Sequence, residues 1–68
     1  MDTAARIKAL RLESQLTQRQ LADRVDVEPI TVSRWERGKA VPSDLNRVLL
    51  ARAFNVHPND LLPTEKAA

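Results

Sequence analysis

Residues 15–39 (QLTQRQLADRVDVEPITVSRWERGK) constrain the fold of this chain more than any other stretch. Thr17 and Gln20 have the spacing of a T-x-x-Q capping box, in which each side chain accepts a hydrogen bond from the other residue's backbone N–H. A helix is therefore predicted over residues 18–25. Asp26 follows directly, and an aspartate tolerates the left-handed conformation that ends a helix better than most residues do.

A second short helix is predicted after a tight turn. Pro29 favours the first helical position, because its missing N–H would have no partner there. Gly38 favours a left-handed end, so the helix should cover residues 29–37. Val32 and Trp35 are three residues apart and should face the interior. The remaining side chains of this helix must then face outwards.

These features occur in an order that is typical of a known family. They are the L-T-Q start, L-A in the first helix, an apolar residue after the turn, V-S-x-W-E in the second helix and the G-K exit. The stretch resembles the helix-turn-helix of the phage repressor/Cro-type family of DNA-binding transcriptional regulators. The likeness continues through apolar positions of the C-terminal half, which are Leu50, Ala51, Phe54, Val56, Leu61 and Leu62. It therefore covers nearly the whole chain.

The resemblance implies an all-α fold, a compact five-helix domain like that of the lambda repressor. The other segments fit this expectation. A first helix is predicted from about residue 3 to residue 14. Ser43 is a candidate N-cap of a fourth helix that runs to about residue 54. Pro58 favours the first turn of a fifth helix, with His57 as its cap.

Length and composition fit one domain. The chain has 68 residues, of which 43% are hydrophobic and 29% charged, as in globular proteins. We expect a single DNA-binding domain over residues 1–68, with a folded core over about residues 3–62 and a flexible tail over residues 63–68. No apolar run has the length of a membrane span, and the N-terminus lacks a signal-peptide pattern. We therefore expect no membrane partner and a cytoplasmic location, bacterial or phage-encoded by resemblance.

The composition disfavours enzyme chemistry. The chain has no Cys, one His, no glycine-rich phosphate loop and no paired carboxylates around an obvious pocket. We therefore predict no catalytic residue, no metal site, no cofactor and no small-molecule substrate. A net charge of +2 is weak evidence for nucleic acid, and the placement of the basic groups matters more.

The outward face of the helix over residues 29–37 is the candidate DNA reader, because a major groove about 12 Å wide admits an α-helix. Arg34 is the first choice for a base contact, since a guanidinium can hold guanine O6 and N7 together. Ile30 either packs on a thymine methyl or is simply exposed. Glu28 either accepts from cytosine N4 or serves the electrostatics of the helix start. The candidate base-reading residues are Arg34, Ile30, Ser33, Glu28 and Pro29.

A second set of residues is expected to contact the DNA backbone. The N-terminus of the helix over residues 18–25 directs free N–H groups at a phosphate, and the resemblance implies a DNA-contacting glutamine at Gln18. Arg19 either contacts a phosphate or pairs with Asp23, four residues on. Trp35 either anchors the core or donates its indole N–H to a phosphate. The candidate positioning residues are Gln18, Arg19, Thr31, Arg37, Lys39 and Trp35.

Arg11 lies beside the apolar stripe of the first predicted helix, which is unusual for a guanidinium. The resemblance implies that Arg11 pairs with Glu36, the glutamate of the W-E step. A half-buried arginine needs such a bidentate carboxylate, so the pair would tie the first helix to the reader. The alternative is that both side chains are solvated separately.

The fourth predicted helix carries two apolar faces at a spacing of 100° per residue. One face should cover the core. The other contains Leu45, Val48 and Leu49 and is a candidate homodimer face. The alternative is that Leu45 and Val48 fill the core.

The sequence therefore predicts a sequence-specific regulator of transcription that binds double-stranded DNA. It would act by occupying its operator with the third helix in the major groove, alone or as a homodimer. The alternative is a protein-interaction module, such as an adaptor or a toxin-neutralising partner, that keeps the fold but not the DNA function.

Overall fold

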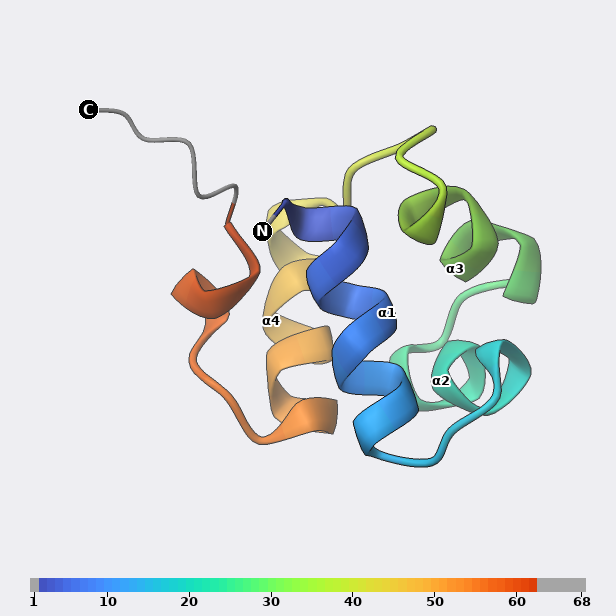
Figure 1. The fold of residues 1–68 in the computed structure, drawn as a ribbon, viewed down its shortest axis with the longest axis horizontal. Helices are drawn as coiled ribbons and strands as arrows, with labels where there is room; N and C mark the ends of the chain where they lie inside the picture. Colours follow the sequence, from blue (N-terminus) through green and yellow to red (C-terminus); the bar gives the residue numbers. More distant parts are fainter. Residues whose placement is uncertain (1, 63–68) are drawn as a thin grey trace.

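The computed structural model describes residues 2–62, and within them the fold is all-helical, without strands (Figure 1). The elements are α1 (Thr3–Glu13), α2 (Gln18–Val25), α3 (Pro29–Glu36), α4 (Asp44–Phe54) and the 3-10 helix η1 (Pro58–Leu61). The all-α class is confirmed, and the four long helices lie where the sequence predicts them. The predicted tail over residues 63–68 lies outside the described residues.

The predicted fifth α-helix is wrong, because η1 is a single 3-10 turn. The predicted cap does form: His57 Nδ1 accepts from the Asn59 N–H at 3.0 Å. Four residues are too few to establish an α-helical ladder. Leu62 is already extended, with ψ of 152°, as a residue that precedes a proline prefers to be.

Local caps explain where the helices begin. The Thr17 N–H donates to Gln20 Oε1 at 2.8 Å, and the Gln20 N–H donates to Thr17 Oγ1 at 3.0 Å, so the capping box forms as predicted. Ser43 caps α4 by accepting from the Asn46 N–H at 3.1 Å. The sequence prediction overlooked the cap of α1, where Asp2 accepts from the backbone N–H of Ala5.

Each of the four α-helices is followed by a residue in the left-handed region. The four residues are Gln15 (φ 60°), Asp26 (φ 59°), Gly38 (φ 73°) and Asn55 (φ 58°). After α3, the Gly38 N–H donates to Trp35 O and the Lys39 N–H donates to Arg34 O, which satisfies carbonyls at the helix end. Gln15 is the unexpected member of this set, because glutamine has no special tolerance for a positive φ.

Replacing Gln15 with glycine is expected to raise the free energy of unfolding by about 0.5–1 kcal/mol, because glycine adopts a positive φ without the steric cost. The thermal midpoint followed by circular dichroism should rise by roughly 2–8 °C. Ser14→Gly is the matched control, because Ser14 has a φ of −83°. There the added chain entropy of glycine should destabilise the fold. An unchanged or lower midpoint for Gln15→Gly would show that the left-handed conformation carries no strain.

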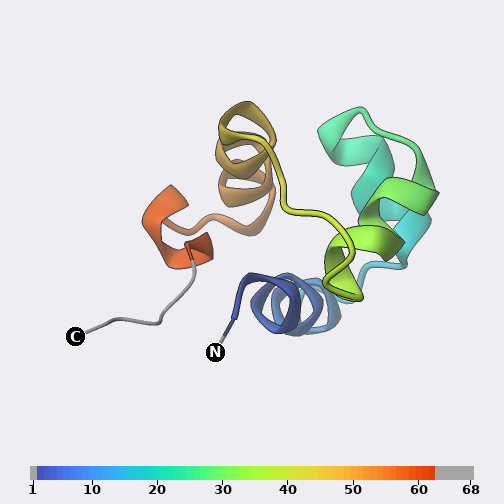
Figure 2. The same cartoon turned by 90° about the horizontal axis from the view of Figure 1, so that it is seen from above.

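The core lies between two halves of the molecule that α1 joins (Figure 2). α3 packs on α2 and α1, while η1 packs on α4 and α1. Every helix contributes to the core, whose buried apolar residues are Ile7, Leu10, Leu21, Ala22, Val25, Val32, Trp35, Leu50, Ala51, Phe54 and Leu61. The two ends of the fold are fastened together, because Thr3 Oγ1 donates to the Leu61 carbonyl at 2.9 Å in a buried position. This hydrogen bond joins the start of α1, on which α3 packs, to the end of η1.

The second apolar face of α4 is only partly covered. Leu45 is 68% exposed, so the alternative that Leu45 fills the core is wrong. Val48 and Leu49 are half-buried, and Leu49 packs against the core. The helix begins at Asp44, and this start turns Leu45 towards solvent. Within residues 2–62, no helix is long and apolar enough to cross a membrane.

Candidate nucleic-acid interface

The outward face of α3 is available to a ligand. Val32 and Trp35 turn inwards, with 0% and 3% of their surface exposed, and fix the rotation of the helix. Ile30 is 59% exposed, and Arg34, one helical turn further along, is also exposed. These two side chains lie four residues apart on one face, so an apolar and a guanidinium group stand side by side there. Such a pair can address adjacent bases in a groove.

The start of α3 is equally accessible. Glu28 and Pro29 are exposed, and the Glu28 side chain makes no capping hydrogen bond. The Glu28 carbonyl accepts from the Thr31 N–H at 2.9 Å instead. The Glu28 carboxylate is thus left to solvent or to a ligand, although its negative charge restricts the ligand to hydrogen-bond donors.

Two of the candidate residues on α3 are engaged with each other. Arg37 Nε donates to Ser33 Oγ at 3.2 Å and to the Ser33 carbonyl at 3.4 Å. Ser33 and Thr31 are half-buried, whereas Arg37 is exposed. Arg37 uses one acceptor position of the Ser33 hydroxyl, whose hydrogen can still be donated to a base. The sequence could not show this, because the contact depends on the rotamer of Arg37.

The first turn of α2 presents donors near α3. The capping box uses the Gln20 N–H, and the Leu21 N–H donates to the Thr17 carbonyl. The N–H groups of Gln18 and Arg19 precede the helical ladder, so they point out of the helix end with the positive end of its dipole. The ion pairs found in residues 2–62 do not include the Arg19–Asp23 alternative, and both of those side chains are exposed.

A buried junction connects three helices beside this turn. Arg11 of α1 donates from Nε to Glu36 Oε2 at 2.6 Å and from Nη2 to Glu36 Oε1 at 3.1 Å. Their side chains are only 10% and 3% exposed, so they are not solvated separately. Arg11 Nη1 also donates to the Leu16 carbonyl at 2.9 Å, which fixes the loop between α1 and α2. This bidentate pair holds α3 on α1.

Gln18 also belongs to this junction, which sequence reasoning missed. Its Nε2 donates to Glu36 Oε1 at 3.1 Å, and the side chain is half-buried. Glu36 therefore accepts hydrogen bonds from both α1 and α2. The sequence placed Gln18 in the first turn of α2 but gave no signal for this contact across 18 residues.

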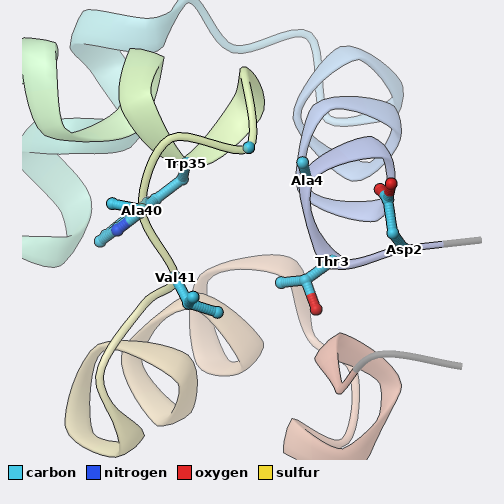
Figure 3. A pocket seen from close by; sticks show the side chains of 7 residues that line it. Asp2, Thr3, Ala4, Trp35, Ala40 and Val41 are labelled. Carbon is cyan, nitrogen blue, oxygen red and sulfur yellow. The ribbon is translucent and has the colours of Figure 1, made fainter. Parts of the chain in front are cut away.

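Trp35 is a core residue at 3% exposure, and it also lines a pocket of about 210 Å³ (Figure 3). This pocket lies between the start of α1, the end of α3 and the linker to α4. Its lining residues are Asp2, Thr3, Ala4, Trp35, Gly38, Ala40 and Val41. Asp2 is the one ionisable side chain among them, and it caps α1. The pocket therefore offers no pair of acid–base groups.

Three further basic side chains lie at the C-terminal end of α3. Lys39 is exposed directly after Gly38, where it can reach the backbone of a ligand held by α3. Arg34 and Arg37 precede it on the same helix end. Groups of three or more side chains suited to a metal ion do not occur within the described part of the chain. The site therefore consists of cations, N–H donors and an apolar side chain around the exposed face of α3.

Comparisons with known proteins agree with this geometry. The helix-turn-helix family model matches residues 7–61. The chain is 32% identical over 66 residues to the HTH-type transcriptional activator BcrR of Enterococcus faecalis, which covers 97% of this chain and 32% of that protein. The chain thus spans about a third of the length of this curated relative.

Solved structures share the fold over most of the chain. The P22 c2 repressor protein, in complex with synthetic operator 9T, superposes with a TM-score of 0.89 at 29% identity, covering 96% of this chain and 98% of that chain. The restriction-modification controller protein C.AhdI from Aeromonas hydrophila superposes with a TM-score of 0.82 at 30% identity. That match covers 88% of this chain and 91% of the controller protein.

Proposed function

The chain belongs to the helix-turn-helix family, and we propose that it is a transcriptional regulator that occupies a specific operator in double-stranded DNA with α3 in the major groove. One observation carries this proposal. The fold matches, over 96% of this chain, a repressor whose structure was solved on an operator. The exposed face of α3 offers a guanidinium and an apolar group, both of which can contact bases in that groove.

Base recognition would centre on two side chains. Arg34 can hold guanine through O6 and N7, and Ile30 can pack on the methyl group of a nearby thymine. Pro29 cannot donate a hydrogen bond and Ile30 has no polar atom. Neither side chain can therefore recognise a base edge by donating a hydrogen bond. Glu28 adds a preference for a donor such as cytosine N4.

Backbone contacts would position α3 in the groove. The N–H groups of Gln18 and Arg19 at the start of α2 suit one phosphate. Arg19, in the first turn of α2, and Lys39, just after the end of α3, add positive charge, and both are exposed. These contacts supply affinity and orientation without sequence information.

The nucleic-acid class can be tested directly. We would titrate the protein into a labelled random-sequence DNA duplex and into an RNA duplex of equal length, at several salt concentrations. The proposal expects salt-dependent retention of the DNA and weaker binding of the RNA, whose deep, narrow major groove excludes an α-helix. Equal binding of both duplexes would contradict insertion of α3 into a major groove.

Lys39→Ala is expected to weaken binding on every duplex sequence and to flatten the slope of log K against log salt by about one unit, because one fewer counterion is released. The matched control is Arg52→Ala. Arg52 is an exposed cation on α4, which lies apart from α3, on the side of α2 that faces η1 (Figure 2). Its removal should leave the slope unchanged. The same slope for Lys39→Ala and the parent would remove Lys39 from the contacts.

We also propose that two copies bind one near-palindromic site, with their α3 helices about 34 Å apart. Two exposed apolar side chains support this proposal: Val41, which is 72% exposed in the linker before α4, and Leu45, which is 68% exposed in the first turn of α4. Sedimentation on DNA should show two copies for the parent and one for Leu45→Glu. The control is Leu12→Glu, at a residue on α1 that is 57% exposed. One copy on DNA for both the parent and Leu45→Glu would contradict the dimer.

A further inference from the structure

The junction of Arg11, Glu36 and Gln18 joins three helices and also orients the Gln18 side chain. The inference drawn from this orientation rests on the proposed DNA binding. Gln18 is the first residue of α2, so its side chain lies beside the helix end that would face a phosphate. Its amide is also hydrogen-bonded to a carboxylate that is 97% buried, because the Glu36 side chain is 3% exposed. A surface side chain is thus anchored from inside the protein.

The chemistry of the contact fixes which way the amide faces. Glu36 Oε1 accepts from Arg11 Nη2 and from Gln18 Nε2, each at 3.1 Å. A carboxylate can only accept hydrogen bonds, so the amide must present its nitrogen and not its oxygen to Glu36. The nitrogen carries two hydrogens, and one remains for another acceptor. A phosphate oxygen is such an acceptor.

The charge of the junction is also suited to a phosphate. The Glu36 carboxylate alone would repel an anion at the start of α2, but the guanidinium of Arg11 pairs with it through two hydrogen bonds. The pair is neutral as a whole, so it orients the amide of Gln18 without placing net negative charge near the DNA backbone. Three features then agree: a directed donor, a helix end and a neutralised carboxylate.

We propose that Glu36, neutralised by Arg11, is a positioning residue for DNA binding. It holds the Gln18 amide so that one N–H points inwards and the other contacts a backbone phosphate. The amide is arranged before DNA arrives, so binding does not have to order this side chain. Gln18 is the contacting residue, and Glu36 acts through it.

A double-mutant cycle tests this dependence. Gln18→Ala is made in the parent and in a background in which Arg11→Met and Glu36→Met replace the ion pair with apolar side chains of similar volume. In the parent, Gln18→Ala should lower the affinity for the preferred duplex about tenfold, as expected for a hydrogen bond to a charged group. In the apolar background the loss should be about twofold or less. The salt slope should stay unchanged in both, because a neutral amide releases no counterion.

The possible outcomes distinguish a failure of the positioning role from a failure of the DNA-binding proposal. An equal loss in both backgrounds would overturn the positioning role while leaving DNA binding intact. Failure of the parent to bind any duplex would overturn the regulator proposal and this inference with it. Thermal unfolding of each variant shows whether the apolar background is folded.

A second measurement decides the matter if that background does not fold. Nitrogen relaxation of side-chain amides in the free parent should give Gln18 an order parameter close to that of a rigid backbone, about 0.85. Gln15 provides the internal control, because it is an exposed glutamine for which residues 2–62 show no side-chain hydrogen bond. Its order parameter should fall below about 0.6. A Gln18 amide as mobile as that of Gln15 would overturn the proposal.

Discussion

Replacing Glu36 with alanine is expected to lower the free energy of unfolding by about 3–5 kcal/mol, because the Arg11 guanidinium would stay buried without its carboxylate. The Arg11 side chain is only 10% exposed, so solvent cannot take over the role of Glu36. A domain of this length has a total stability of roughly 3–10 kcal/mol. The variant should therefore be largely unfolded at a temperature where the parent is folded.

Urea denaturation followed by circular dichroism measures this loss. The control is Asp44→Ala, which breaks the ion pair between Arg47 Nη1 and Asp44 Oδ1 at 3.0 Å, where the aspartate side chain is 93% exposed. That change should cost about 1 kcal/mol or less. The double replacement Arg11→Met with Glu36→Met should recover much of the stability lost in Glu36→Ala, since apolar pairs of similar volume substitute well for buried ion pairs. A loss for Glu36→Ala no larger than that for Asp44→Ala would contradict a buried pair.

The second large effect concerns base recognition. Arg34→Ala is expected to cost about 1–3 kcal/mol of binding free energy on the preferred site and to relax the preference at one base pair. The reason is the loss of two parallel hydrogen bonds to one guanine. The protein itself should remain stable, because Arg34 is exposed and the ion pairs found within residues 2–62 do not include it.

Competition binding against a set of single-base variants of the site measures both quantities. Arg34→Lys is the sharper control, because a lysine keeps the charge but loses the planar fork. It should keep the salt slope of the parent and still lose much of the discrimination at that base pair. An unaltered preference at every position of the site would remove Arg34 from the reading residues.

The helices could be predicted because the residues next to each boundary determine where a helix begins or ends. Thr17 and Gln20 form a cap within one turn, Pro29 can begin a helix, and Gly38 and Asn55 can end one. Each of these signals acts over at most a few residues. Where such a signal was ambiguous, the prediction failed, as at η1, where a proline start and an apolar pair led to a 3-10 turn instead of an α-helix.

The contacts that could not be predicted join distant parts of the chain or depend on strain. Thr3 reaches Leu61 across 58 residues, and Gln18 reaches Glu36 across 18. Neither contact leaves a periodic pattern in the sequence. Gln15 adopts a positive φ because the chain must turn from α1 into the loop fixed by Arg11. The residue type does not predict this conformation, because glutamine has no preference for a positive φ. The outward-facing residues of α3 were easier to predict, because the buried Val32 and Trp35 define the inner face of the helix and therefore also its outer face.

The most direct test of the regulator proposal is selection of bound sequences from a pool of random double-stranded DNA, repeated at two salt concentrations. The account predicts a motif that persists at the higher salt, because base contacts add to the salt-sensitive backbone term. A two-fold-symmetric motif would also give the spacing of the half-sites. No retention of DNA at either salt concentration would contradict the account, and the protein-interaction module would then be the better description of this chain.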